Sequence, residues 1–231
     1  MSINILSMEE VRRHHNNLKR DLIKRVTEKN SCVLDVGCGM GGDLKKWKAV
    51  GGVKLFACDP DHNALTEAKN RSSTIGIKVS FYHGDISSVR LPPQTFDVIC
   101  YNFSIQYCFE NEKLFHQTIE YITHHLKVGG KLFGCVPDSD MVLMRTPYTD
   151  PLGNFFTRKS DTGMGKFGEK LYVQLVDTPY YADGPKAEPI AYKDLLVTFL
   201  ETKGIVLVEW KPMGTTGLTG LYSQFIFVRY Q

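Results

Sequence analysis

A glycine-rich segment with nearby acids is the part of the sequence best suited to chemistry. Three glycines have the G-x-G-x-x-G spacing that brings backbone close to a ligand between a strand and a helix: Gly37, Gly39 and Gly42. Three acids stand at or just after the ends of successive expected strands: Asp35, Asp59 and Asp85. Because the carboxyl ends of parallel strands meet at one edge of a sheet, we expect the acids and the glycine loop to surround one ligand.

The positions of these acids favour one kind of ligand over another. Asp59 can accept hydrogen bonds from a ribose diol, which both NAD and S-adenosylmethionine carry. Asp35 lies beside the glycine loop, where it would repel a pyrophosphate but suit the ammonium and sulfonium groups of S-adenosylmethionine, directly or through water. Asp85 can accept from an adenine amino group. We therefore predict an S-adenosylmethionine site and disfavour an NAD oxidoreductase.

The pattern around the loop predicts the elements that position it. Helices are expected over 8–28, 43–50, 62–71, 111–126 and 191–203. Strands are expected over 31–36, 54–59, 77–85, 96–102, 131–137, 205–210 and 223–230. Ser7 and Glu10 suit a capping box for the first helix. Alternating strands and helices are typical of a doubly wound, mostly parallel α/β sheet, and the last two strands predict a closing antiparallel hairpin.

Length and composition limit the other possibilities. The 231 residues suit a single domain, 1–231, in which the Gly-, Pro- and Tyr-rich segment 138–189 is an insertion over the carboxyl edge of the sheet. A net charge of +3 excludes a strongly basic nucleic-acid coat but permits a local basic groove. The six cysteines lack zinc-site spacing, and we expect reduced, mostly buried thiols and no metal. We expect no membrane segment, and histidines only as surface or core residues.

Several motifs in chain order resemble those of mRNA cap guanine-N7 methyltransferases. "VLDVGCGMGGDLKKWK" is similar to the signature of that family, and "HHNNLKRDLI" to the asparagine- and lysine-containing segment on its preceding helix. "YNFSIQYCFE" matches an aromatic motif, while "AEPIAY" and "GLYSQFIFVR" supply a late glutamate and a tyrosine before the last strand. The resemblance runs from about residue 12 to the end of the chain. It implies a class I, Rossmann-like methyltransferase with a seven-stranded, mostly parallel sheet, an antiparallel last strand and an insertion after the fifth strand.

The resemblance also implies two groups of binding residues. The candidate cofactor-binding residues include the acids and two of the glycines described above. They are Lys19, Asp35, Gly37, Gly39, Asp59, Asp85, Asn102, Phe103 and Tyr107. The candidate residues for the cap guanosine and its triphosphate are Asn16, Asn17, Lys46, Arg71, Gln106, Glu188 and Tyr222. Guanine N7 carries a lone pair and no proton, so no proton-transfer residue is nominated, and Phe103 and Tyr107 are the nearest candidates to the reacting atoms.

Some positions depart from the family pattern. Met40 stands where lysine is usual, which puts triphosphate binding in question, and Gln106 and Asn102 stand where histidine and glutamine are common. The divergence suggests the enzyme of a large DNA virus. The chain would then be the carboxyl-terminal part of a capping polypeptide that also carries triphosphatase and guanylyltransferase domains. The alternative is that Met1 is a native start. The expected location is the host cytoplasm or a virion, or the nucleus for a cellular protein. The alternatives are a small-molecule methyltransferase and a catalytically silent module that binds caps or a capping partner.

Overall fold

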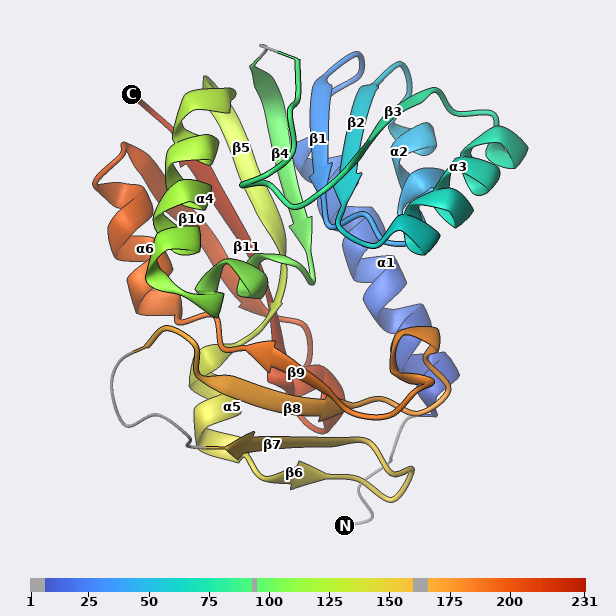
Figure 1. The fold of residues 1–231 in the computed structure, drawn as a ribbon, viewed down its shortest axis with the longest axis vertical. Helices are drawn as coiled ribbons and strands as arrows, with labels where there is room; N and C mark the ends of the chain where they lie inside the picture. Colours follow the sequence, from blue (N-terminus) through green and yellow to red (C-terminus); the bar gives the residue numbers. More distant parts are fainter. Residues whose placement is uncertain (1–6, 93–94, 160–165) are drawn as a thin grey trace.

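The computed structural model describes residues 7–92, 95–159 and 166–231, and is built around a seven-stranded sheet in the order β10-β11-β5-β4-β1-β2-β3 (Figure 1). Residues 160–165 of the expected insertion lie outside the described residues. The strands of this sheet are β1 (Cys32–Val36), β2 (Lys54–Asp59), β3 (Val79–His83), β4 (Phe96–Asn102), β5 (Leu126–Pro137), β10 (Ile205–Pro212) and β11 (Tyr222–Arg229).

The strand directions confirm the expected α/β architecture. Strand β1 runs parallel to β2 and β4, β2 parallel to β3, and β4 parallel to β5. The last strand, β11, is antiparallel to both β5 and β10. The sheet is therefore mostly parallel, and the carboxyl ends of β1, β2 and β4 meet at one edge, where the glycine loop and the acid of β2 lie.

The helices follow the expected order, and the local sequence explains where the first of them begins. They are α1 (Met8–Val26), α2 (Leu44–Val50), α3 (His62–Ile75), α4 (Glu112–His125), α5 (Ser139–Arg145) and α6 (Lys193–Glu201), with 3₁₀ turns η1 (Ile105–Glu110), η2 (Pro179–Tyr181) and η3 (Leu218–Leu221). The predicted capping box is present: the Glu10 amide donates to Ser7 Oγ at 3.2 Å, and the Ser7 amide donates to Glu10 Oε2 at 2.8 Å. In Figure 1, α1 passes behind the sheet while α4 lies in front of it.

The core lies where the central strands meet these helices. Val33 and Leu34 of β1 are fully buried, as are Trp47 of α2 and Phe133 of β5. The near-continuous burial of β1 and β4 is typical of a parallel strand covered on both faces. This burial fixes the register of the strands, and hence the height at which their terminal residues meet the glycine loop.

A second, antiparallel sheet follows β5 and lies beyond the carboxyl ends of the parallel strands (Figure 1). Its strands, in the order β6-β7-β8-β9, are β6 (Tyr148–Thr149), β7 (Phe155–Lys159), β8 (Lys170–Gln174) and β9 (Lys186–Pro189). The sequence indicated strand pieces here, such as β8, but not the sheet that joins them or the short helix α5. The pairing of Leu171 with Glu188 places that glutamate on β9, next to η1.

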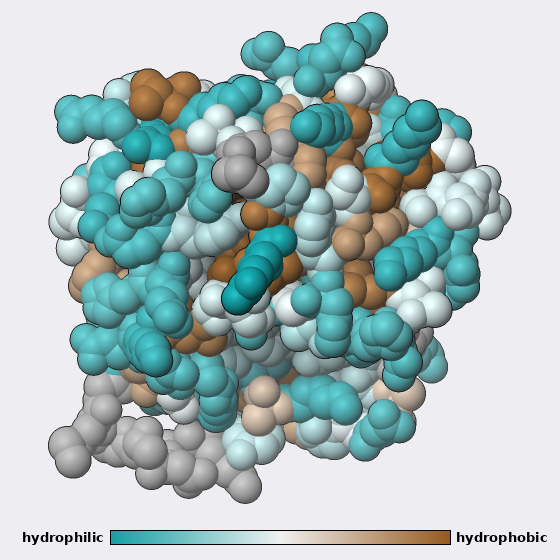
Figure 2. Space-filling model, turned by 45° about the horizontal axis from the view of Figure 1, so that its top comes forward, coloured by the Kyte–Doolittle hydropathy of each residue, from teal (hydrophilic) through white to brown (hydrophobic). Residues whose placement is uncertain are grey.

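The remaining sequence expectations concern thiols, metals and membranes. The six cysteines are free, and Cys32 and Cys38 are only partly buried. Among the described residues, no group of three or more His, Cys, Asp or Glu side chains is placed to hold a metal ion, and no helix is long and apolar enough to span a bilayer. The face of the molecule in Figure 2 is covered mostly by hydrophilic side chains, with hydrophobic residues showing between them.

Candidate functional site

A cavity of about 570 Å³ lies between the two sheets, at the carboxyl edge of the parallel strands. Its walls come from α1, the glycine loop, η1, the β8–β9 connection, β9 and η3, and from the ends of β2 and β5 and the start of β11. Most of the candidate site residues line it: Asn16, Lys19, Gly37, Gly39, Asp59, Phe103, Gln106, Tyr107, Glu188 and Tyr222. Cofactor-side and substrate-side candidates thus share one continuous space.

The glycine loop is built so that backbone alone borders the cavity. Gly37 has φ +72°, and a Cβ there would lie 2.4 Å from the Cβ of Ser104, so the close approach of loop and η1 requires glycine. Gly39 has φ +51°, and a Cβ there would meet no atom within 4 Å, which leaves open space beside the backbone. Gly41, and not Gly42 of the fingerprint, is the third loop residue with positive φ.

Asp59 at the end of β2 holds the loop and also lines the cavity. Its Oδ2 accepts from the Gly39 amide at 2.7 Å, and its Oδ1 accepts from the Asp61 amide at 2.9 Å. Burial raises the pKa of the Asp59 carboxyl, and the two amide donors oppose that shift. Each carboxylate oxygen keeps a lone pair for a ligand hydroxyl, so Asp59 can join a bound ribose to the backbone of the loop.

Replacing Asp59 by alanine should weaken S-adenosylhomocysteine binding by on the order of 1–3 kcal/mol, because an acceptor for the ribose diol is lost. Titration calorimetry on the folded variant measures this change. Asp85→Ala is the comparison, because Asp85 also follows a strand end but does not line the cavity. Unchanged affinity in Asp59→Ala, or a larger loss in Asp85→Ala, would contradict the assignment.

Glu188 is a buried carboxylate held by two neutral donors. Its Oε1 accepts from Tyr181 Oη at 2.5 Å, and its Oε2 accepts from Gln106 Nε2 at 3.1 Å. Burial raises the pKa of Glu188 despite these two donors. Gln106 Nε2 also donates to the Phe103 carbonyl at 3.1 Å, which fixes its amide orientation, and Gln106 Oε1 is buried without a partner among the described residues. The site therefore offers hydrogen-bond acceptors to a ligand with adjacent N–H donors.

Aromatic rings form the wall between the loop and Glu188. Phe103 directly follows β4 with φ +61°, an unusual backbone conformation for a large side chain, and its ring packs edge-on against Tyr222 at 5.4 Å between centroids. Lys19 Nζ lies 5.6 Å from the centroid of the Phe103 ring. These rings can hold a flat ligand beside the glycine loop.

His15 belongs to this aromatic wall, although the sequence suggested only surface or core roles for histidines. Its ring lies 5.9 Å from Phe103 and 5.3 Å from Tyr222, and its Nε2 is buried without a partner among the described residues. Burial, with His14 and Lys19 nearby, lowers the pKa of His15 to about 4, so the ring is neutral at pH 7. Helical spacing could have identified His15. Residues four positions apart lie on the same face of a helix, and His15 is four positions from both Val11 and Lys19.

A buried cluster of charged side chains lies next to the cavity. Its central residue, Asp43, was not among the site residues predicted from the sequence. Asp43 Oδ1 lies 3.0 Å from Lys19 Nζ and 2.6 Å from Lys46 Nζ, and Oδ2 accepts from Asn102 Nδ2 at 2.8 Å. Burial opposes ionisation of Asp43, but the two ammonium groups outweigh it and hold its pKa well below the usual range. Lys46 also donates to Asn16 Oδ1 at 2.9 Å. Lys46 and Asn102 therefore serve this cluster and do not line the cavity.

The structure corrects the expectation that Asp35 faces a cationic ligand. The side chain is buried, does not line the cavity, and accepts from Trp47 Nε1 at 2.9 Å through Oδ2. Burial raises the pKa of Asp35 to about 7, with Asp43 as a further cause. Asp35 therefore joins β1 to α2, and a buried carboxyl that is partly neutral at pH 7 is a poor partner for a sulfonium.

Three other candidates also lie away from the cavity. Asp85 Oδ1 accepts from the Ser87 amide at 2.8 Å, within its own turn. Arg71 on α3 pairs with Glu67 at 2.7 Å in an exposed i,i+4 ion pair. Asn17 is exposed and accepts from Arg20 at 2.7 Å. In each case the side chain contacts a neighbour in its own helix or turn. Sequence motifs do not reveal such contacts.

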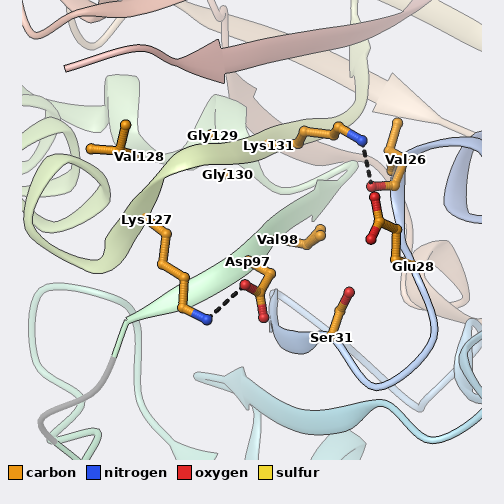
Figure 3. Close-up of a pocket in the computed structure, with 10 residues that line it drawn as sticks. All are labelled: Val26, Glu28, Ser31, Asp97, Val98, Lys127, Val128, Gly129, Gly130 and Lys131. Atoms are coloured by element: carbon orange, nitrogen blue, oxygen red, sulfur yellow. Dashed lines mark hydrogen bonds and ion pairs between the residues drawn. The ribbon is translucent and has the colours of Figure 1, made fainter.

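A second, smaller cavity of about 240 Å³ lies at the opposite, amino-terminal end of β4 and β5 (Figure 3). There Lys127 Nζ pairs with Asp97 Oδ1 at 2.6 Å, and Lys131 Nζ donates to the Val26 carbonyl at 3.3 Å. None of the candidate residues lines it. Its two lysines already have partners, so the larger cavity is the better candidate site.

The sequence of this chain is similar to those of known methyltransferases. A family model described as the mRNA (guanine-N(7))-methyltransferase domain matches residues 4–184. The mRNA cap guanine-N(7) methyltransferase of Candida glabrata is 26% identical over 205 residues, covering 83% of this chain and 47% of the relative. That of Schizosaccharomyces pombe is 31% identical over 154 residues, covering 62% and 43%. The chain thus spans less than half the length of these relatives.

Solved structures share the fold at lower identity. The PH0226 protein from Pyrococcus horikoshii matches with a TM-score of 0.70 at 16% identity, covering 98% of this chain and 93% of that one. An S-adenosylmethionine-dependent methyltransferase from Clostridium acetobutylicum matches with a TM-score of 0.65 at 14% identity, covering 94% and 91%. The fold is that of the class I S-adenosylmethionine-dependent methyltransferases.

Proposed function

The chain belongs to the mRNA (guanine-N(7))-methyltransferase family, and from this premise we propose that it transfers a methyl group from S-adenosylmethionine to N7 of the guanine cap, GpppN, of mRNA. The observation that carries the proposal is that the glycine loop with Asp59 and the acceptor pair Glu188 and Gln106 line the same cavity. A methyl donor at the loop and a guanine at Glu188 would meet beside Phe103.

The loop side of the cavity fits the methyl donor. Gly39 leaves open space against bare backbone, and Asp59 presents a carboxylate anchored on the loop amide. Lys19 lines the same space with an ammonium group held by Asp43, suited to a ligand carboxylate. We assign Gly37, Gly39, Asp59 and Lys19 to this ligand, which supplies an electrophilic methyl group when bound.

The opposite side fits guanine better than adenine. Glu188 presents a carboxylate that guanine can meet with N1–H and its exocyclic amine together, whereas adenine lacks a donor at N1. Tyr222 and Phe103 supply flat apolar surface beside it. Tyr107 closes the cavity at η1, where its hydroxyl lies 2.8 Å from that of Tyr180.

The chemistry asks little of the side chains beyond placement. Guanine N7 has a free lone pair and carries no proton, so displacement at a methyl group needs no general base. The protein's contribution is to align the nucleophile with the methyl group and to exclude water, and such alignment is worth several kcal/mol of the barrier. Phe103, held in its unusual backbone conformation, is the residue best placed to define this alignment.

The deciding experiment incubates the chain with labelled S-adenosylmethionine and GpppA or GpppG, then identifies the methylated atom by nuclease digestion and mass spectrometry. We expect label on guanine N7. Transfer to a nucleoside without the triphosphate at equal efficiency would favour a small-molecule methyltransferase, and cap binding without turnover would favour a silent binding module.

The finer parts of the proposal rest on the sequence resemblance. They are RNA binding, a single methyltransferase domain over 1–231, an origin in a large DNA virus, association with triphosphatase and guanylyltransferase domains, and action in the host cytoplasm, or in the nucleus for a cellular protein. Divergence at Met40, Asn102 and Gln106 supports the viral origin. Gel filtration and pull-down with the other two capping activities test the association.

A further inference from the structure

The charged side chains that line the large cavity are unevenly distributed. Asp59 ends β2, Asp61 caps α3 and Glu188 lies on β9, whereas the cations Arg12 and Lys19 both come from α1. Lys19 lies 3.0 Å from Asp43, which also pairs with Lys46, and the Lys19 ammonium is already assigned to the carboxylate of the methyl donor. Among the described residues no carboxylate pairs with Arg12, so the guanidinium gives α1 an uncompensated positive charge at the cavity.

Arg12 contacts the connection between β8 and β9 of the second sheet. Its Nη1 donates to the backbone carbonyl of Asp177, in the connection between β8 and β9. Asp177 has φ +52°, so the chain turns sharply there and directs a carbonyl at the guanidinium. The contact occupies one of the five N–H donors of Arg12, and the side chain is exposed, which leaves further donors free at the mouth of the cavity.

We propose that Arg12 binds the triphosphate of the cap, an inference that rests on the proposed function of this cavity. A triphosphate would be repelled by Asp59 and Asp61 and attracted to the α1 side. A planar guanidinium can bind phosphate oxygens through two parallel hydrogen bonds. Because its Asp177 contact is to a carbonyl, phosphate binding requires no ion pair to be broken.

The sequence resemblance implies two cations for the cap and its triphosphate, and one of them, Lys46, pairs with Asp43 and does not line the cavity. Arg71 does not line the cavity and is paired with Glu67, and Met40 carries no charge where lysine is usual. Arg12 thus supplies, from another element, the charge that these positions do not bring to the cavity.

The test measures the affinities of Arg12→Ala, Arg12→Lys, Arg13→Ala and Arg71→Ala for GpppA, guanosine and S-adenosylhomocysteine across a salt series. Arg13 is the matched control, because it is exposed on the same helix but does not line the cavity. Arg12→Ala should weaken GpppA binding roughly tenfold, as expected for a charge-assisted contact. It should also lower by about one the slope of the logarithm of GpppA affinity against the logarithm of salt concentration. Guanosine and S-adenosylhomocysteine affinities should stay within about twofold, and Arg12→Lys should recover part of the GpppA loss.

Three results would overturn the proposal. One is unchanged GpppA affinity in Arg12→Ala, and another is a larger loss in Arg71→Ala than in Arg12→Ala. The third is an equal loss for guanosine and GpppA, which would mean that Arg12 only ties α1 to the second sheet. The position of methylation in the parent chain reports on the proposed function separately, so N7 transfer with any of these results removes the Arg12 assignment alone.

Discussion

Glu188→Ala should lower kcat/KM for GpppA by roughly 10- to 1000-fold, at about 1.4 kcal/mol per decade. Glu188 is buried with its oxygens directed to Tyr181 and Gln106, so it is fixed before the ligand arrives. Hydrogen bonds to a charged acceptor contribute about 1.5–3 kcal/mol each, and the variant would leave guanine N1–H and the amine unpaired. Steady-state rates measure the loss, while S-adenosylhomocysteine affinity should be nearly unchanged.

Two comparisons separate recognition from structural damage. An inosine cap lacks the exocyclic amine, so it should be a poor substrate for the parent chain but suffer a smaller further loss in Glu188→Ala. Tyr181→Phe removes one donor to Glu188 and keeps the carboxylate, so its effect should be milder. Equal losses for guanosine and inosine caps would show that Glu188 does not contact that edge of the base.

Asp43→Ala should lower the free energy of unfolding by about 3–5 kcal/mol, the usual cost of removing one partner from a buried ion pair. Lys19 and Lys46 would both lose their counter-ion, and the Lys46 side chain is only 6% exposed. Urea denaturation followed by circular dichroism measures the change. Lys46→Met in the Asp43→Ala background should recover part of the loss, because it removes one uncompensated charge.

The pH dependence of this stability has a definite sign. The pKa of Asp43 is lower in the folded chain than the value of about 3.9 of an unperturbed Asp. Asp43 therefore stabilises the fold above that value, and its contribution is lost as the pH falls through the folded-state pKa. The difference in the free energy of unfolding between the parent chain and Asp43→Asn should be constant from about pH 7 to 5 and should become smaller in more acidic buffer. A gap that widens on acidification would show that Asp43 is not ionised in the folded state.

The parallel half of the fold was predictable because its signals are local. Buried strands such as β1 and β4 are mostly apolar segments, and the capping box at Ser7 marks the start of α1. The second sheet was harder to predict from the sequence. Its strand β6 has two residues and β9 has four, and such segments become strands only by pairing with β7 and β8.

The site shows the same division between local and long-range information. The sequence identified Asp59 and Glu188, but it chose Asp35 as the acid of the glycine loop when Asp43 is the one that holds Lys19. Both acids border the loop, and only the packing of α2, which brings Trp47 against Asp35, assigns one to the core and the other to the charge cluster. Arg12 was missed because its importance depends on the β8–β9 connection, about 165 positions along the chain.

The location of Asp59 on the first sheet and Glu188 on the second has a consequence for cooperativity. Because both residues line one cavity, a ligand bound at either of them forms part of the wall that the other ligand meets, so the second ligand to bind finds a more complete site. S-adenosylhomocysteine should then raise the affinity for GpppA, and GpppA should raise the affinity for S-adenosylhomocysteine by the same factor, because coupling between two binding sites is reciprocal. The cavity between the sheets would in this way favour the complex in which both substrates are present.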